Sequence, residues 1–169
     1  MRPQAGNPRS NGLTITVMVA MLCGSIVLYF WLFDTPLMQV FKEWTAQTTG
    51  FALGLIGTDV EISGTTVASD SFAYQIVTEC TAVGPLLLYA AVVLAYPVGF
   101  RPKMLGLILG SLIISGLNLI RLVSLFYVGT YWRDHLGELH LLFWQGAMML
   151  SVVILWLYWL RRWDRAATV

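Results

Sequence analysis

Four stretches of the chain are apolar enough and long enough to be interpreted as helices that cross a membrane. The first covers residues 13–33, which are 21 residues without a charge, and at ~1.5 Å per residue such a helix crosses ~30 Å of hydrocarbon. Three further stretches follow at residues 81–97, 104–128 and 139–160. The pattern predicts an all-α integral membrane bundle with about four transmembrane helices, in a single domain over residues 1–169.

The longest region between these predicted spans, residues 34–79, has two parts with different patterns. Residues 37–56 mix aromatic and aliphatic side chains with charged residues and threonines, which is typical of a short helix that lies at the membrane interface. In residues 60–67 and 72–77, alternating β-branched and aromatic residues flank a connection rich in Ser, Gly and Asp, which predicts a small β-hairpin. We expect this extracytoplasmic segment to deliver the residues that follow it to the membrane surface.

The composition agrees with a membrane protein and excludes several other classes. Hydrophobic residues make up 57% of the chain and charged residues only 11%, where soluble domains have about 25%. The net charge is +1, and the charges are scattered rather than gathered in a basic stripe, so no nucleic-acid partner is expected. The lipid bilayer is the partner that the composition predicts.

The distribution of charge orients the predicted spans. Residues 34–79 hold six acidic residues and one Lys, and residues 129–138 hold two acidic residues and one Arg. Basic residues instead gather at both ends of the chain and in the turn after residue 97: Arg2, Arg9, Arg101, Lys103, Arg161, Arg162 and Arg165. Because cytoplasmic segments are enriched in Lys and Arg, we expect a multi-pass protein of the cell membrane with both termini in the cytoplasm.

Three reactive side-chain types fall at one predicted depth. Cys80 stands where the outer segment enters the second span, and Arg121 lies ~25 Å along the third span at ~1.5 Å per residue. His140 opens the fourth span, again from the outer side. The three side chains are therefore expected to meet just below the outer surface of the membrane.

Each of these residues also has a simpler interpretation. Cys80 could be a small packing residue, as Cys23 is expected to be in the middle of the first span. Arg121 could extend its head group to the interface, although Asn118, one turn away on the same helix face, favours a polar pocket. His135 competes with His140, which is favoured because the helix that follows fixes its position at the membrane edge.

One glycine pair suggests how the helices pack. Gly106 and Gly110 form a Gly-x-x-x-Gly pair in the third span. Small residues at this spacing let helices approach closely, and we expect the pair to serve packing inside the bundle rather than a dimer.

Three short blocks of this sequence resemble the signature blocks of the exosortase and archaeosortase family. They are Thr78-Glu79-Cys80-Thr81, Asn118-Leu119-Ile120-Arg121 and the histidine of Leu139-His140-Leu141-Leu142-Phe143-Trp144-Gln145. The resemblance covers about residues 60–159 and is greatest to the compact exosortase H branch. The chain differs in having Ala82 where many members have Gly, and it lacks the additional spans of the larger exosortases.

The resemblance implies a membrane-embedded cysteine protease and transpeptidase without a cofactor. Its substrates would be membrane-anchored exported proteins with a carboxyl-terminal sorting signal, made of a short motif, a transmembrane helix and a basic tail. Cys80 would be the nucleophile, Arg121 would stabilise the thiolate or the oxyanion, and His140 would be the general acid and base. Glu79, Thr81 and Asn118 would support them, and a lipid, a glycan or water would accept the cleaved chain.

Two other functions are compatible with the same residues. A zinc-dependent peptidase could use Cys80, His135 and His140, but the five-residue spacing of the histidines does not place both rings on one helix face, so no metal site is expected. In a non-catalytic assembly or lipid-binding protein, Arg121 would instead pair with an acidic partner or a lipid phosphate. Unlike this non-catalytic protein, a thiol enzyme requires the sulfur of Cys80.

Overall fold

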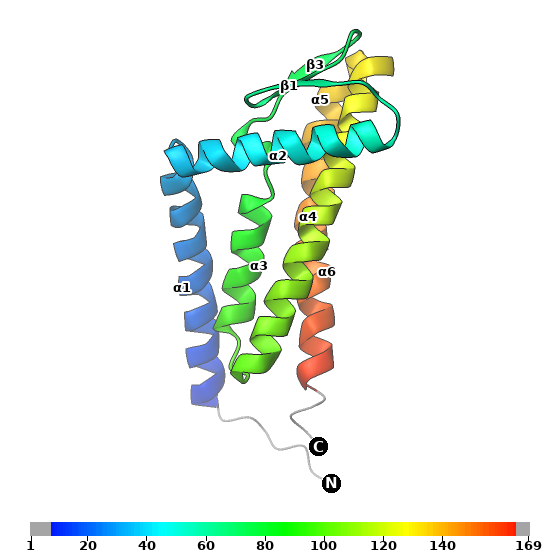
Figure 1. Cartoon of the computed structure of the whole chain (residues 1–169). Helices are drawn as coiled ribbons and strands as arrows, with labels where there is room; N and C mark the ends of the chain where they lie inside the picture. The colour runs from blue at the N-terminus through cyan, green and yellow to red at the C-terminus, as the bar shows by residue number, and fades with distance from the viewer. Residues whose placement is uncertain (1–7, 165–169) are drawn as a thin grey trace.

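The computed structural model of the protein describes residues 8–164. Of the basic residues expected at the cytoplasmic ends, Arg2 and Arg165 lie outside the described residues, and so does the side chain of Arg9. The rest of the chain folds into a group of parallel and antiparallel helices that carries a small sheet at one end (Figure 1).

Four helices run beside one another along the length of the molecule (Figure 1). They are α1 (Pro8–Leu32), α3 (Val83–Ala95), α4 (Phe100–Tyr131) and α6 (Gln145–Asp164). A helical run leads into α6 without a break, through η2 (Arg133–His135), α5 (Leu136–Glu138) and the π-helical η3 (Leu139–Trp144). The start of α1 and the end of α6 lie at one end of the molecule, and the sheet lies at the other.

Three helical segments within the described residues are long and apolar enough to cross a membrane: Gly12–Leu32, Phe100–Tyr131 and Arg133–Trp163. The remaining predicted span, residues 81–97, forms the shorter helix α3 of 13 residues, which is ~20 Å long at ~1.5 Å per residue. The helix ends at Ala95 because Tyr96, which precedes Pro97, is held in an extended conformation. The structure is that of an all-α membrane protein in which one apolar helix is shorter than predicted.

Helix α2 (Pro36–Leu55) lies across the ends of α3 and α4 instead of running beside them (Figure 1). It begins after Thr35, whose side chain accepts a hydrogen bond from the backbone of Met38 at 3.3 Å. Its inner face is buried, while large side chains such as Trp44 and Phe51 are exposed. This orientation agrees with the prediction that residues 37–56 do not form a span.

The outer segment contains an antiparallel sheet of three strands, in the order β1 (Glu61–Ser63), β2 (Thr66–Ala68) and β3 (Ala73–Gln75). Strands β2 and β3 pair as the predicted hairpin would, but the first predicted arm, residues 60–67, folds back on itself. Gly64 permits this turn because its φ of 59° lies in the left-handed region. The sheet therefore has one strand more than predicted.

Two clusters of buried side chains form the core. The outer cluster joins α2, the sheet and the last turns of α4, and it contains Ala46, Leu53, Val67, Phe72, Ile76, Cys80, Leu122 and Phe126. The inner cluster joins α3, α4 and α6 and contains Tyr89, Val93, Ile114, Met148, Val152 and Trp159. Arg121 and Asn118 lie on α4 between the two clusters, so a polar layer separates them.

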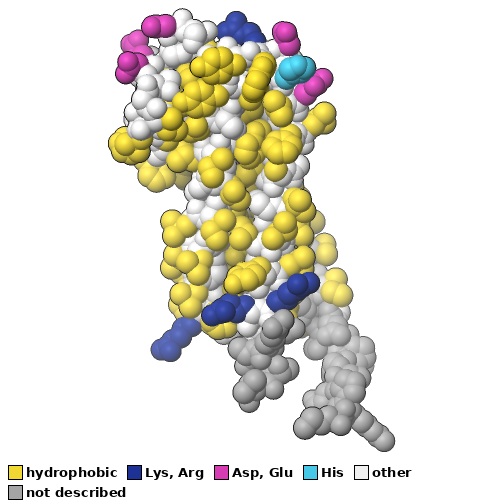
Figure 2. All heavy atoms as spheres, turned by 90° about the vertical axis from the view of Figure 1, so that its right-hand side faces the viewer, with side chains coloured by type: hydrophobic (Ala, Val, Ile, Leu, Met, Phe, Trp, Pro, Cys, Tyr) yellow, Lys and Arg dark blue, Asp and Glu magenta, His cyan; other side chains and the backbone are white. Residues whose placement is uncertain are grey.

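Charged side chains follow the predicted asymmetry on the face seen in Figure 2. Acidic side chains gather at the end that carries the sheet, together with a basic patch and a histidine, and only basic side chains are seen at the opposite end. Hydrophobic side chains cover much of the surface between the two ends. Exposed apolar surface of this extent on helices is typical of contact with lipid.

The predicted role of the glycine pair is confirmed, because both glycines face neighbouring helices of the same chain. A Cβ added at Gly106 would overlap the indole ring of Trp159 on α6, and one added at Gly110 would overlap the ring of Tyr89 on α3. The hydroxyl of Tyr89 donates a hydrogen bond to the carbonyl of Gly106 at 3.1 Å. The pair brings α3 and α6 close to α4.

We expect Gly110→Ala to lower the free energy of unfolding by ~1–3 kcal/mol, because the Tyr89 ring must move out of a packed core. Gly116→Ala is the matched control on the same helix, since no side chain or backbone from the rest of the fold lies within 4 Å of the added Cβ. The control should stabilise the helix by ~0.5–1 kcal/mol. Thermal unfolding of both purified variants in detergent measures the difference, and equal effects of the two substitutions would contradict this account.

Candidate functional site

Cys80 ends a short 3-10 turn, η1 (Thr78–Cys80), that connects the sheet to α3. The backbone N–H of Cys80 donates to the carbonyl of Val77 at 2.9 Å. The hydroxyl of Thr81 donates to the carbonyl of Thr78 at 2.7 Å and closes the turn from the other side. Cys80 is only 5% exposed, so the turn holds a buried thiol in a defined position.

Two side chains of α4 bind the backbone of this turn. The side-chain amide of Asn118 donates from Nδ2 to the carbonyl of Cys80 at 3.0 Å. The guanidinium of Arg121 donates from Nη1 to the carbonyl of Glu79 at 3.3 Å. Because Asn118 and Arg121 are one helical turn apart, they attach η1 to a single face of α4.

Arg121 also contacts the third predicted residue. Its Nη2 lies 2.9 Å from Nε2 of His140, and Sγ of Cys80 lies 3.6 Å from the same nitrogen. A guanidinium can only donate hydrogen bonds, so Nε2 of His140 accepts and the imidazole is neutral, with its proton on Nδ1. The structure thus brings together a thiol, a guanidinium and an imidazole from three separate segments.

The position of His140 depends on a feature that the sequence pattern does not indicate. His140 lies in the π-helical segment η3, where each turn holds about one residue more than in an α-helix. One extra residue changes the direction in which the side chains of η3 point by roughly 100° relative to those of α6. The π-helix therefore decides which face of the last helix carries the imidazole, and π-helical turns are frequent at functional sites.

The other predicted residues take different places. Glu79 contributes its backbone carbonyl, while its side chain is exposed. His135 is exposed and pairs with Glu138, with 3.8 Å between Nδ1 and Oε2, and it does not line the cavity that contains Cys80. Among the described residues, no three His, Cys, Asp or Glu side chains are grouped in a way that could hold a metal ion.

The surroundings of Cys80 act on its acidity in opposite directions. Burial raises the pKa of the Cys80 thiol above its usual range, whereas the backbone of Val77 and the cation of Arg121 lower this pKa, and Glu79 raises it. Burial is the largest of these effects. The resting thiol is therefore protonated at neutral pH, and its reaction requires a base.

This balance gives a pH dependence that can be measured. In a Cys23→Ala background, where Cys80 is the one remaining cysteine, its alkylation by iodoacetamide should keep rising above pH ~8.5, because the thiolate forms at higher pH than usual. Arg121→Met removes a nearby cation and should move the midpoint to higher pH, while Glu79→Gln should move it to lower pH. Rates measured by mass spectrometry test this, and identical midpoints in all three chains would contradict it.

A cavity of about 250 Å³ opens beside Cys80 and His140. Its walls come from β3 and the residues next to it, from α4 and from α5, and they include Phe72, Tyr74, Gln75, Val77, Leu122, Leu125, Leu136 and Gly137. The hydroxyl of Tyr74 donates to the carbonyl of Leu122 at 3.4 Å. Sequence reasoning did not identify these lining residues, since aromatic and aliphatic residues are common throughout this chain.

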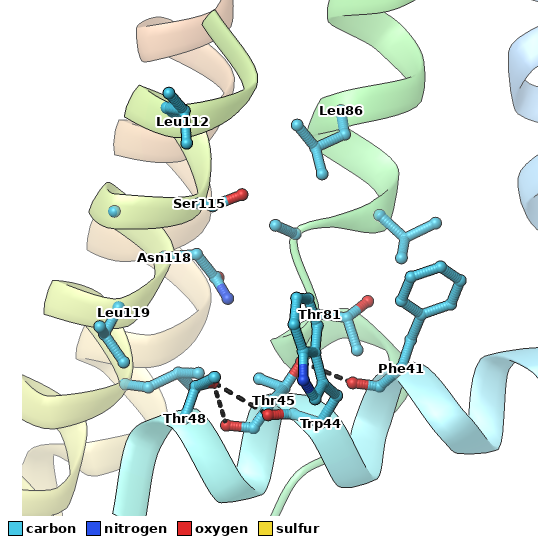
Figure 3. Close-up of a pocket in the computed structure, with 14 residues that line it drawn as sticks. Phe41, Trp44, Thr45, Thr48, Thr81, Leu86, Leu112, Ser115, Asn118 and Leu119 are labelled. Atoms are coloured by element: carbon cyan, nitrogen blue, oxygen red, sulfur yellow. Dashed lines mark hydrogen bonds between the residues drawn. The ribbon is translucent and has the colours of Figure 1, made fainter. Parts of the chain in front are cut away.

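A second cavity, of about 400 Å³, lies on the other side of the η1 turn, between α2, α3 and α4. Figure 3 shows the side chains that surround it, with Phe41, Trp44, Thr45 and Thr48 from α2, Leu86 from α3, and Leu112, Ser115, Asn118 and Leu119 from α4. Asn118 and Thr81 line this cavity, whereas Cys80 lines the smaller one. The η1 turn is thus a partition between two cavities.

Comparison with known proteins identifies a family. A family model described as transmembrane exosortase (Exosortase_EpsH) matches residues 10–159. No curated protein and no solved structure matches the chain. The matched region includes Cys80, Arg121 and His140, all of α3 and α4, and most of α1 and α6.

Proposed function

The chain belongs to the transmembrane exosortase family, and we propose on this basis that it is a membrane-embedded cysteine protease and transpeptidase. Its substrates are exported proteins with a carboxyl-terminal sorting signal, which it cleaves and transfers to a surface acceptor. The observation that carries the proposal is the distance of 3.6 Å between Sγ of Cys80 and Nε2 of His140, with Arg121 2.9 Å from the same nitrogen. A packing cysteine has no need of a base and a cation at this distance.

In the first step, Sγ of Cys80 attacks the carbonyl carbon of the scissile peptide and forms a carbon–sulfur bond. The thiol proton passes to Nε2 of His140, and the carbonyl oxygen becomes the oxyanion of a tetrahedral intermediate. When the carbon–nitrogen bond breaks, His140 returns the proton to the leaving amine. The amino-terminal part of the substrate is then held as a thioester on Cys80.

Arg121 has two tasks that fall in sequence. In the free protein its guanidinium occupies Nε2 of His140, the nitrogen that must accept the thiol proton. A substrate carbonyl that enters beside Cys80 offers the guanidinium a new acceptor, and the negative charge that develops there strengthens this bond. Transfer of Arg121 from His140 to the oxyanion would free the base when it is needed.

A second nucleophile completes the reaction. An amine or hydroxyl group attacks the thioester carbonyl, its proton passes to His140, and the thiol of Cys80 is released with the proton that His140 gives up. A lipid or glycan acceptor yields an anchored product, and water yields a free carboxylate. Asn118 stays bound to the carbonyl of Cys80, and Arg121 stays bound to the carbonyl of Glu79. The η1 turn therefore need not move between formation of the thioester and its release.

The orientation in the membrane follows from charge and is part of the proposal. The chain is a single membrane domain of the cell membrane with four spans, and its termini are in the cytoplasm. The end that carries the sheet, α2 and Cys80 faces outward, where exported proteins arrive (Figure 1). The substrate is then cleaved where its own terminal helix leaves the outer leaflet.

The direct test is to trap the thioester. Membranes that contain the full chain and a tagged exported protein with a sorting signal are quenched with acid, and Cys80 is examined by mass spectrometry. We expect an adduct on Cys80 that neutral hydroxylamine removes, and much less of it in His140→Ala, which lacks the base. Processing without an adduct in either chain would contradict the proposal.

A further inference from the structure

Strand β3 lies at an open edge of the sheet, because the strand order is β1-β2-β3. The carbonyl of Phe72 accepts from Ser69, and the N–H of Ile76 donates to Thr65, both at 2.8 Å. In an antiparallel ladder these directions alternate from residue to residue. The backbone groups of Phe72, Tyr74 and Ile76 therefore face β2, and those of Ala73, Gln75 and Val77 face away from it.

This open edge leads directly to the nucleophile. Gln75 and Val77 line the same 250 Å³ cavity as Cys80 and His140. The carbonyl of Val77 accepts the N–H of Cys80 at 2.9 Å, so the edge ends at the turn that holds the thiol. Ala73, Gln75 and Val77 are all exposed, whereas their neighbours Phe72 and Ile76 are buried in the core.

We propose that the substrate's sorting segment binds as an additional strand along the outer edge of β3, and that this pairing places the scissile peptide over Cys80. The inference rests on the proposed function. A peptide must be extended to present one carbonyl to a buried thiol, and an edge strand with unpaired N–H and C=O groups binds extended peptides by main-chain hydrogen bonds. The cavity beside Cys80 then receives a side chain of the bound segment.

The direction of the added strand follows from the topology. Strand β3 runs toward η1 and then into α3, so the chain travels from the outer end of the molecule toward the membrane (Figure 1). A sorting segment followed by a transmembrane helix also runs toward the membrane. The substrate strand therefore pairs in parallel with β3, with its carboxyl end at Cys80.

Gln75→Pro tests the pairing, because proline removes the N–H that points to the open edge and leaves the ladder with β2 intact. The assay is cleavage of the tagged exported protein by the full chain in membranes. We expect kcat/KM to fall about tenfold or more, mainly through a higher KM, because main-chain bonds to the substrate are lost. Alkylation of Cys80 by iodoacetamide should stay within about twofold, since iodoacetamide makes no strand pairing.

Thr65→Val is the matched control. Gln75 also donates from its side chain to the hydroxyl of Thr65 at 3.3 Å, and Thr65→Val removes this bond without changing the edge. Cleavage by Thr65→Val should be near that of the unmodified chain. If Gln75→Pro cleaves as well as Thr65→Val does, strand addition is wrong while the proposed function stands. If Cys80→Ser cleaves normally, the proposed function itself is wrong.

A cross-linking experiment keeps the test decisive if proline disturbs the Cys80 turn. The photoreactive residue p-benzoylphenylalanine replaces Gln75 or Ile62 in a Cys80→Ser chain. The backbone of Ile62 faces the open edge of β1, on the opposite side of the sheet. Cross-links to the tagged protein from position 75 but not from position 62 are expected, and equal yields from both positions would overturn the proposal.

Discussion

Cys80→Ser is expected to abolish processing of the tagged exported protein, with a fall in rate on the order of 10⁴-fold or more, as when the nucleophile of a hydrolase is removed. A serine hydroxyl is far less acidic than a thiol, and neutral His140 is too weak a base to compensate. The substitution should preserve the fold because the two side chains are similar in size. The measurement is the rate at which the substrate band is converted in membranes.

Cys23→Ser is the matched control for this experiment. Cys23 is the other cysteine of the chain and lies exposed on α1, outside the two cavities described above. Its variant should process substrate at the original rate. Full activity of Cys80→Ser would instead favour a non-catalytic assembly or lipid-binding protein, in which the sulfur has no part.

Arg121→Met is expected to lower kcat/KM by ~10²–10³-fold, the loss usually seen when an oxyanion donor is removed. Its effect on stability should be much smaller. Arg121 is 1% exposed, and burial of its charge costs at least ~2.5–3.5 kcal/mol on insertion scales. The hydrogen bonds of Arg121 to Glu79 and His140 stabilise the fold by ~1.5–3 kcal/mol each. This stabilisation nearly cancels the cost of burying the charge.

Arg121→Lys separates charge from geometry. Lysine keeps the cation but has a single ammonium group in place of the planar fork, so it cannot reach the Glu79 carbonyl and the substrate oxygen together. We expect its activity to lie between those of the original chain and Arg121→Met.

Arg101→Met, at the opposite end of α4, is the control for loss of a cation. Loss of folding rather than of turnover in Arg121→Met, measured by thermal unfolding, would contradict this account.

The three central residues could be predicted because each is unusual in its surroundings. Burial of an arginine within an apolar helix costs free energy, so Arg121 stands out. Cys80 and His140 each stand at the outer start of a predicted span, which places them at the same membrane depth as Arg121. The structure brings the three side chains together, since Nε2 of His140 contacts both Sγ of Cys80 and Nη2 of Arg121. The sequence also indicated the relation between Asn118 and Arg121, because residues three apart share a helix face.

Other features of the site could not be predicted for physical reasons. A motif does not tell whether a residue acts through its side chain or its backbone, and Glu79 contributes its carbonyl. The π-helix around His140 depends on tertiary packing, because the intrinsic helix propensities of its residues do not distinguish it from an α-helix. The alternating pattern does not separate the first strand from the second, because the turn at Gly64 is short and leaves the alternation of residues nearly unbroken.

The shortness of α3 has a consequence for the lipid around it. At ~20 Å, the helix is about 10 Å shorter than a hydrocarbon layer of ~30 Å. Such hydrophobic mismatch is relieved when the bilayer thins next to the short helix, which lowers the headgroup layer at that point. In the proposed orientation, the thiol at the outer end of α3 then meets water and polar headgroups without any of them having to enter the hydrocarbon, as the proposed transfer to a polar nucleophile requires.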